Sequence, residues 1–548
     1  MLSSDILGLI GYQLLVTNPY YDGRNRSVFF EFGHGHFERH TSDLIAFSMT
    51  CRHIRTACMP LLFKCLVITT ALPDPAVVEV VSPYIQIAVV VAPELNLHEA
   101  YSTLFGQLPQ LSELHVHELR TASTGTDSSD WIFRLPRVET VVLHMRYGSE
   151  LLLTSAFAVP PLREFTMIAP GRLDRLSQLS FEQIIWENAA LEYVLDHVRQ
   201  TLRVLRVPGE SMRLSFLSAA LWPRLSRLVL FGECPLYDTS WPAVIRVMPA
   251  LHSFVLDVAL PRHATPPMLW PRDVDGSDTT ETPALRGLML TSPRPDDPVF
   301  ARLPPTLTEL SLREAPRYNC YTRSERAQMI RFFPSARHYE STLLSSRGAL
   351  QIFSVLQGRH IASLELVVRE DAFELEMLAR VAEACPTLAW FEFHRYRDVP
   401  EDHTGDGRRS TPGEGVPTAS LALAFSAFRS LRALRLNLDF PLTFHEYTQR
   451  DGILQTDYPR AVFVQSQAQI FADNAAWLST LAIYTRHRRE ENYWRTWSLQ
   501  NLPTGVVVLN EEIGRLGPHL SPDDFEMEHK EKGRFRRLVD RLVHRLRG

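Results

Sequence analysis

Lysine is almost absent from this 548-residue sequence. Among its 57 basic residues only Lys64, Lys530 and Lys532 are lysines, and all the others are arginines. None of the three follows a glycine, whereas the phosphate-binding loop of many nucleotide hydrolases places a lysine directly after its last glycine. The composition therefore excludes that class of nucleotide-binding enzyme.

Cysteine is also scarce, and no pair of cysteines has the Cys-x-x-Cys spacing of a zinc knuckle. The six cysteines are too few and too scattered for a disulfide framework, so we expect a reducing compartment. No apolar run approaches the roughly 18 residues of a membrane span. The first apolar stretch has no lysine or arginine ahead of it, which does not fit a secretory signal. We expect a protein of the cytoplasm, the nucleus or both, with no membrane partner.

Charge of either sign is not in excess, because 57 basic residues face 62 acidic ones and the formal net charge is -5. Such a balance gives no overall attraction to nucleic acid, and we expect no nucleic-acid partner.

The motifs His-Glu-x-x-His, Gly-x-Ser-x-Gly and Gly-x-Gly-x-x-Gly are absent. His34, His36 and His40 stand close together, but without a cysteine or carboxylate at convincing zinc-ligand spacing, so a solvated loop is expected there. The sequence predicts no enzyme, no cofactor and no metal site.

One short phrase recurs along most of the chain: a proline or small residue followed by Leu-x-x-Leu-x-Leu, with other apolar residues in place of some leucines. The first eight copies start 27, 24, 40, 23, 26, 34 and 22 residues apart. This spacing is typical of leucine-rich repeats. The copies begin at Leu111, Val138, Leu162, Leu202, Leu225, Leu251, Leu285, Leu307, Ile361, Leu388, Leu431 and Leu478.

The phrase predicts a strand and a turn in each copy. Its last two apolar residues alternate as on a strand with one buried face, and its first fills the turn that enters the strand. A single copy cannot bury its own apolar face, so the copies are expected to stack. We therefore predict an α/β fold over residues 69–500: a leucine-rich-repeat solenoid with a parallel sheet on its concave face. The asparagine or cysteine usual after the strand is mostly missing and the copies vary in length, which predicts an irregular solenoid with loops at 261–283 and 395–417.

A different pattern precedes the repeats. Ser3 or Ser4 can cap a helix whose apolar residues recur at helical spacing. A second helix is predicted from about Ser42 along an apolar stripe that includes Cys51 and Cys58, and Pro60 is expected to start a third short turn.

Residues 1–68 resemble an F-box, the helical module that docks substrate receptors onto the Skp adaptor of cullin-RING ubiquitin ligases. Residues 2–5 look like the family's Leu-Pro-x-Glu opening, 43–45 its Asp-Leu-Leu, 50–55 its Val-Cys-Lys-x-Trp-Arg and 62–63 its closing Leu-Trp. Ser3 replaces the proline and Ile54 the tryptophan. The resemblance implies an adaptor-binding surface and module core made by Leu2, Ile6, Leu44, Phe47, Cys51, Ile54, Leu62 and Phe63.

Residues 16–42 form an insertion where an F-box has a short connection. The added cost of closing the longer loop, roughly 1.5 kcal/mol, is tolerable. The segment is either an extra strand or partner anchor, or non-coding sequence retained in the gene model. At the other end, residues 501–548 include a predicted basic amphipathic helix, which either caps the solenoid or meets an anionic partner.

An F-box followed by irregular leucine-rich repeats resembles a large receptor family of fungi and other eukaryotes. The resemblance implies a non-enzymatic receptor in which the module binds the Skp-type adaptor, and through it a cullin, while the repeats bind an unidentified protein substrate. Two alternatives stay open. One is a repeat scaffold outside the ligase with a degenerate F-box, and the other is a hydrolase hidden in the inserts.

Overall fold

The structure is a computed structural model. It describes residues 48–49, 51–68, 72–91, 98–119, 129–145, 159–168, 181–260, 264–270, 285–314, 343–356, 358–396, 416–438, 440, 457–485, 493–501 and 507–511. Contacts divide the chain into two compact units. Unit 1 holds most of the chain up to Thr239, and unit 2 holds most of the chain from His252 onward.

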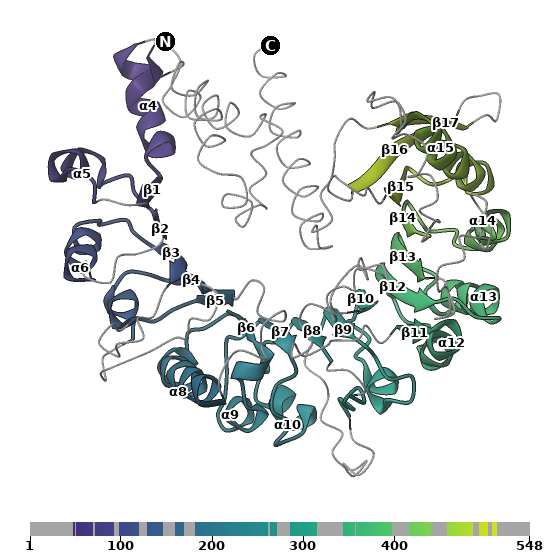
Figure 1. Ribbon diagram of the computed structural model, residues 1–548, viewed down its shortest axis with the longest axis horizontal. Helices are drawn as coiled ribbons and strands as arrows, with labels where there is room; N and C mark the ends of the chain where they lie inside the picture. Colours follow the sequence, from purple (N-terminus) through teal and green to yellow (C-terminus); the bar gives the residue numbers. More distant parts are fainter. Residues whose placement is uncertain are drawn as a thin grey trace, which may run out of the picture. The chain divides into compact units, whose positions relative to one another are not determined.

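Unit 1 is a ladder of parallel strands in which each strand pairs with the next along the chain, from β1 to β7. Its helices lie on one face of the ladder (Figure 1). In chain order its elements are α4 (Arg52–Leu62), β1 (Cys65–Ile68), α5 (Pro75–Val81), β2 (Ile87–Val91), α6 (His98–Gly106), β3 (Glu113–Leu119), η2 (Ser129–Arg134), β4 (Thr140–Met145), β5 (Glu164–Ile168), α8 (Phe181–Val198), β6 (Val204–Pro208), η4 (Gly209–Ser211), α9 (Leu214–Ser218) and β7 (Arg227–Glu233).

Unit 2 repeats the arrangement and ends differently. Strands β8, β9, β10, β12, β13, β14 and β15 pair in parallel in that order, β11 adds to β12, and β16 and β17 extend the sheet antiparallel. Its elements are α10 (Trp241–Arg246), β8 (Ser253–Ala259), β9 (Gly287–Thr291), η5 (Pro298–Arg302), β10 (Glu309–Arg313), β11 (Leu344–Ser345), α12 (Ser346–Val355), β12 (Ser363–Arg369), α13 (Glu374–Ala384), β13 (Trp390–Tyr396), α14 (Thr418–Phe425), β14 (Ala433–Asn437), α15 (Asp457–Asn474), β15 (Thr480–Thr485), β16 (Tyr493–Asn501) and β17 (Val507–Glu511). The predicted α/β class with a mostly parallel sheet is confirmed.

The recurring phrase accounts for the strand register. The second apolar residue of one copy pairs with the second of the next: Leu205 lies opposite Leu228, and Leu310 opposite Leu364. The apolar residues two positions on are likewise paired and buried. Because neighbouring copies share this register, the core-facing side chains form continuous apolar rows, and the predicted strand positions are confirmed.

In several copies the first apolar residue of the phrase closes the turn before the strand. The backbone N–H of Leu307 donates to the carbonyl of Pro304 at 3.1 Å, and that of Leu388 donates to Cys385 at 3.1 Å. The same i to i-3 bond recurs at Leu431 and Leu478. These leucines are buried, so the turn satisfies a backbone donor that would otherwise be costly to bury.

Two local predictions near the N-terminus were wrong. The predicted helix through Cys58 is interrupted at Cys51, whose backbone is extended (φ -159, ψ 164) and whose Sγ accepts from the N–H of Ile54 at 3.5 Å. Cys51 therefore caps α4 and is exposed, not a core residue. Pro60 lies inside α4 and does not start a new turn, although it lacks the N–H that an i to i-4 bond needs.

The predicted inserts and C-terminal segment are partly described. Arg395 belongs to β13, so the strand extends beyond the predicted start of the second loop. Within 261–283 the described stretch 264–270 buries Leu269 and Trp270. Strand β17 falls inside 501–548, while the predicted basic helix lies outside the described residues. Among the helices that the structure describes, none is long and apolar enough to cross a membrane.

Leu228 provides a direct test of the core ladder because only 1% of it is exposed. Leu228→Ala should lower the free energy of unfolding by about 2–5 kcal/mol, since it leaves a cavity between neighbouring copies. Urea unfolding followed by circular dichroism measures the loss. Leu221→Ala is the matched control, because Leu221 is 52% exposed, and it should change stability by less than about 0.5 kcal/mol. Equal losses in the two variants would contradict the assignment of Leu228 to the core.

Candidate functional site

The adaptor-binding residues predicted from the F-box resemblance are only partly described. Leu2, Ile6, Leu44 and Phe47 lie outside the described residues. The other four, together with a buried cysteine, lie on or beside α4 and are Cys51, Ile54, Cys58, Leu62 and Phe63.

The apolar side of α4 is organised around Cys58, which is fully buried. Ile54 and Leu62 are half-buried and pack against it, so the structure brings these two predicted residues together. Phe63 ends the helix, and its N–H donates to the carbonyl of Met59 at 3.0 Å. The predicted residues that the structure describes thus form a small apolar cluster beside the exposed Cys51.

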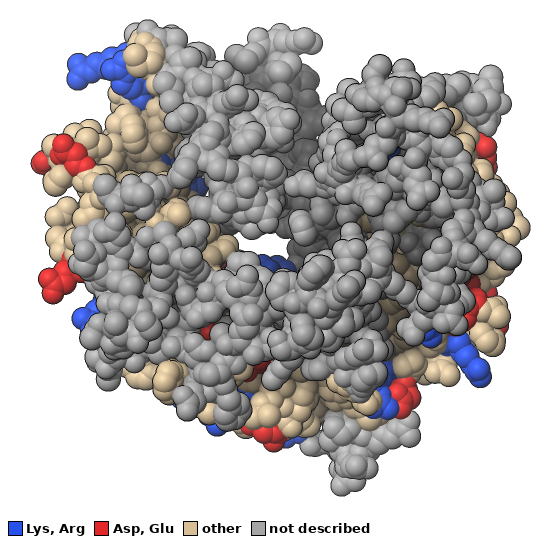
Figure 2. Space-filling view, in the orientation of Figure 1, with Lys and Arg blue, Asp and Glu red and all other residues tan. Residues whose placement is uncertain are grey.

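The outer surface of α4 is basic. Arg52 and Arg55 are exposed on it, whereas the neighbouring helix α5 exposes Glu79. Figure 2 shows blue atoms at α4 and red atoms at α5 on this face of the molecule. The half-buried apolar cluster of α4 is therefore bordered by positive charge.

A row of polar side chains crosses four strands of unit 2. Ser311, Glu365, Glu392 and Arg435 each stand between the two buried apolar residues of their strand, and the register places each beside the next. Side chains alternate across a strand, so these four lie on the face opposite the leucines. All four are buried. We call them the polar ladder.

Hydrogen bonds and an ion pair join neighbours within the polar ladder. Ser311 Oγ donates to Glu365 Oε2 at 2.7 Å, and Arg435 Nη1 lies 2.9 Å from Glu392 Oε2. Arg313, two positions along β10 from Ser311, adds a second guanidinium: its Nη1 lies 3.9 Å from Glu365 Oε2, and its Nη2 donates to Asp257 at 2.6 Å. Each buried carboxylate of the polar ladder therefore has an arginine close by, which offsets the cost of burying its charge.

His394 connects the polar ladder to the next row of side chains. Its Nε2 lies 2.7 Å from Glu392 Oε1, and its Nδ1 lies 3.2 Å from Asn437 Nδ2. An amide NH₂ donates and a carboxylate accepts, so the two bonds assign the proton to Nε2 and leave Nδ1 as an acceptor. Tyr396 extends the network, since its hydroxyl donates to Glu314 at 2.9 Å.

Trp494 closes one end of this network. It is fully buried on β16, with the Arg435 guanidinium 4.1 Å above its ring and His394 against it edge-on at 5.9 Å. The ring excludes water from one side of the Arg435–Glu392 pair and adds a cation–π contact. Ions screened from water in this way interact more strongly than exposed ones.

The network shows little of what nucleophilic catalysis requires. A serine nucleophile needs a base that is free to take its proton, but the Glu365 carboxylate that accepts from Ser311 also lies 3.9 Å from Arg313, and both nitrogens of His394 are engaged. Glu365, Glu392 and His394 bring their ligand atoms within 4.8 Å, as a metal site would. Arg313 and Arg435 already compensate the two carboxylates and would repel a cation.

A second polar group lies in unit 1. His115 and His117 are two residues apart on β3, and His144 stands on the adjacent strand β4. The rings of His117 and His144 stack with centroids 3.9 Å apart. Burial, followed by the neighbouring histidines, lowers the pKa of His117 to about 2. Burial, followed by His115 and Arg206, lowers the pKa of His144 to about 4.

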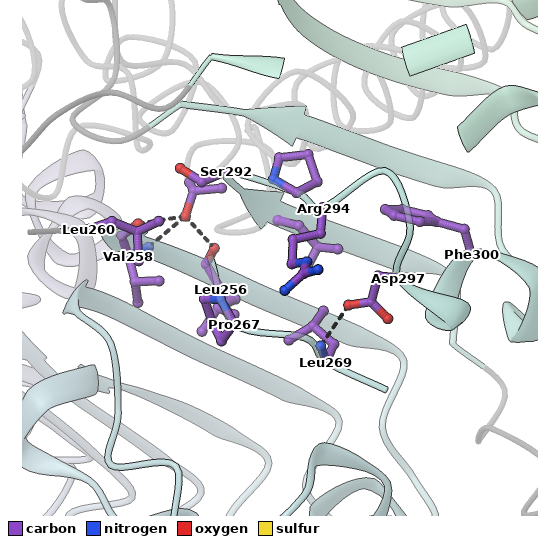
Figure 3. Close-up of a pocket in the computed structure, with 12 residues that line it drawn as sticks. Leu256, Val258, Leu260, Pro267, Leu269, Ser292, Arg294, Asp297 and Phe300 are labelled. Carbon is purple, nitrogen blue, oxygen red and sulfur yellow. Dashed lines mark hydrogen bonds between the residues drawn. The ribbon is translucent and has the colours of Figure 1, made fainter. Parts of the chain in front are cut away.

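A small cavity lies between β8 and the segment after β9, and the residues that border it stabilise the fold. Its volume of about 20 Å³ is enough for a water molecule and not for a metabolite. Asp297 borders it and accepts from the N–H of Leu269 at 2.6 Å (Figure 3). It also accepts from the N–H of Val299 at 2.9 Å. Burial raises the pKa of Asp297, and these bonds partly oppose the shift. Asp297 thus holds the 264–270 segment against the sheet.

Sequence reasoning missed both polar groups. Glu365 in Leu-Glu-Leu and His115 in Leu-His-Val stand between the two core residues of the phrase, whereas His117 and His144 stand one position after the second core residue. A comparison of these positions between successive copies would have found them. Comparison of the sequence with models of known protein families and with curated protein sequences gives no match.

The Arg435–Glu392 pair can be tested by a double-mutant cycle. Glu392→Leu alone should cost about 3–5 kcal/mol of stability, because it leaves the Arg435 guanidinium buried without its carboxylate. Adding Arg435→Met should recover part of the loss, giving a coupling energy of about 1–3 kcal/mol in urea unfolding. The exposed pair Arg380–Glu383 at 2.9 Å is the control and should couple by less than about 1 kcal/mol. Additive losses at Glu392 and Arg435 would refute the buried pair.

Thiol labelling tests the placement of Cys51. Burial raises the pKa of the Cys385 thiol to about 12 and that of Cys65 to about 11. At about pH 8 only roughly one Cys385 thiol in ten thousand is ionised, and the thiolate is the reactive form. Brief treatment with iodoacetamide followed by peptide mass spectrometry should therefore modify the exposed Cys51 before Cys385 and Cys65. Faster labelling of Cys385 than of Cys51 would contradict the burial of Cys385 and the exposure of Cys51.

Proposed function

We propose that this chain is the substrate-recognition subunit of a Skp-cullin-F-box ubiquitin ligase. Residues 1–68 are the F-box-like module that docks the Skp-type adaptor, and through it a cullin. Residues 69–500 are an irregular leucine-rich-repeat solenoid whose parallel sheet lines the concave face and binds a protein substrate. The protein itself is not an enzyme and needs no cofactor, and neither nucleic acid nor a membrane is among its partners.

The observation that carries the proposal is the strand ladder with its repeated turn. Successive copies of the phrase add parallel strands in the same register, and in several copies the first apolar residue closes the same i to i-3 turn. Stacking of similar units that cannot bury their apolar face alone is the physical basis of repeat proteins, whose extended surfaces bind other proteins. Both units follow this rule, which supports the solenoid interpretation.

The N-terminal part of the proposal depends on the sequence resemblance and on α4. The cluster of Ile54 and Leu62 around Cys58 gives the closing helix of the module a compact apolar side. Ile54 and Leu62 remain half-buried, so they are available to an adaptor. Arg52 and Arg55 beside them favour a partner surface that carries acidic residues.

The mechanism is proximity. A receptor that holds its substrate near the ubiquitin-charged conjugating enzyme raises the effective concentration of the reacting amine without supplying a catalytic group. The engaged nitrogens of His394 and the charge-balanced carboxylates of the polar ladder suit a rigid recognition framework better than a reaction centre.

The alternative is a repeat scaffold outside the ligase, with a degenerate F-box. Two observations favour it: Ile54 stands in place of the family's tryptophan, and Cys51 caps α4 with an extended backbone. Adaptor binding separates the two functions, because the scaffold would not bind the Skp adaptor.

Co-purification of the full chain with the Skp adaptor tests the proposal. Leu44→Asp with Phe47→Asp should abolish binding, because two carboxylates would be buried without partners in the apolar interface. Val77→Asp with Val80→Asp is the matched control, since these valines of α5 are 55% and 63% exposed outside the module, and it should leave binding intact.

The outcomes distinguish the two functions. If the unchanged chain does not bind the Skp adaptor, the function is that of a repeat scaffold outside the ligase. Full binding by the Leu44/Phe47 variant would refute the assigned adaptor surface. Iodoacetamide labelling of Cys51 gives an independent readout, because adaptor binding over α4 should slow its modification while that of Cys234 is unchanged.

A further inference from the structure

Three histidines of unit 1 lie on one face of the strands. His115 and His117 alternate with buried Leu114 and Val116 along β3, and His144 follows buried Leu143 on β4. The histidines are therefore on the face opposite the apolar core. Positions 117 and 144 are 27 residues apart in the sequence, and the strand pairing brings them together.

The spacing of the rings suits a shared metal ion. One nitrogen from each of the three imidazoles lies within 4.8 Å of the others. In a tetrahedral zinc site with bonds of about 2.0–2.1 Å, two nitrogen ligands lie about 3.3–3.4 Å apart. The rings of His117 and His144 are stacked in this structure, so the imidazoles must rotate until their in-plane lone pairs converge on the ion, while the two strands hold the Cα positions.

Glu113 orients one of the three ligands. Its Oε1 lies 2.6 Å from His115 Nε2, so Nε2 carries the proton and Nδ1 presents its lone pair. A carboxylate that accepts from the second nitrogen is a usual companion of a metal-bound histidine, because it fixes the ring and increases the ligand's basicity. It also places a negative charge near the site.

The charges around the group differ from those around the acidic trio of unit 2. Glu365 and Glu392 there have guanidinium partners, whereas the three side chains of this group are imidazoles, which bind a metal as neutral ligands. Arg206 lies near His144 and opposes a cation, whereas Glu113, which contacts His115, adds a negative charge.

We propose that His115, His117 and His144 bind one divalent transition metal of the zinc class, with Glu113 as a positioning residue. Three imidazoles with no oxygen ligand disfavour Ca²⁺ and Mg²⁺, and the absence of thiolates from the set disfavours Cu⁺. Three protein ligands leave one position of a tetrahedral ion for water or an external group. This site is independent of the proposed receptor function.

Titration of the untagged, chelator-treated full chain with Co²⁺ tests the site, because tetrahedral Co²⁺ has visible absorption bands. One equivalent should bind and be displaced by Zn²⁺. His117→Gln should weaken binding by more than about 100-fold, and Glu113→Gln by about 10- to 100-fold. His252→Gln removes an exposed imidazole and should leave the affinity unchanged. His34, His36 and His40 changed together to Gln should also leave it unchanged.

Several results would overturn the proposal. One is that the unchanged chain binds neither Co²⁺ nor Zn²⁺. Another is that binding disappears in the His34/His36/His40 variant and persists in His117→Gln. X-ray absorption of the zinc-loaded unchanged chain gives a readout that does not depend on whether a variant folds. It should detect three imidazole ligands, and a spectrum with one or none would refute the site. Circular dichroism confirms that each variant used for affinity is folded.

Discussion

Side chains alternate between the two faces of a strand, and the rest of this structure depends on that alternation. Each copy of the phrase puts two apolar residues on one face, as Leu364 and Leu366 do in β12, and must bury them against the next copy. The register that pairs these residues also aligns the residue between them, here Glu365, with its equivalents on neighbouring strands. The register that buries the apolar residues thus also arranges a second, polar surface, which the core itself does not require.

On that surface the chain carries buried charge, which is costly in free energy and gives little net stability. A buried ion pair such as Arg435–Glu392 is often no more stable than an apolar pair of the same volume, whereas removal of one partner is strongly destabilising. The geometry is correspondingly specific: the Trp494 ring covers the guanidinium, and His394 holds the other carboxylate oxygen. Such a network fixes the positions of its side chains.

The sequence predicted the strands well because their pattern is local. A phrase of six residues contains the turn leucine and both core residues, so Leu307, Leu310 and Leu312 were assigned without knowledge of their neighbours. The helix near Cys51 was mispredicted because apolar spacing continues through a residue whose backbone is extended. The polar ladder and the three histidines could not be read in the same way, because they depend on register between strands and on burial, which are properties of several copies together.

The same phrase supports different chemistry in the two units, and the intervening positions account for the difference. In unit 2 they hold carboxylates and guanidinium groups that neutralise one another, as Glu392 and Arg435 do. In unit 1 His115 holds such a position, and His117 and His144 stand one position after the second core residue on the same face, where burial lowers their pKa and keeps them neutral. A substitution at an intervening position leaves the apolar rows intact, so this face can change its chemistry while the fold is kept. A leucine in the same strand has no such freedom, because its volume is matched to the next copy.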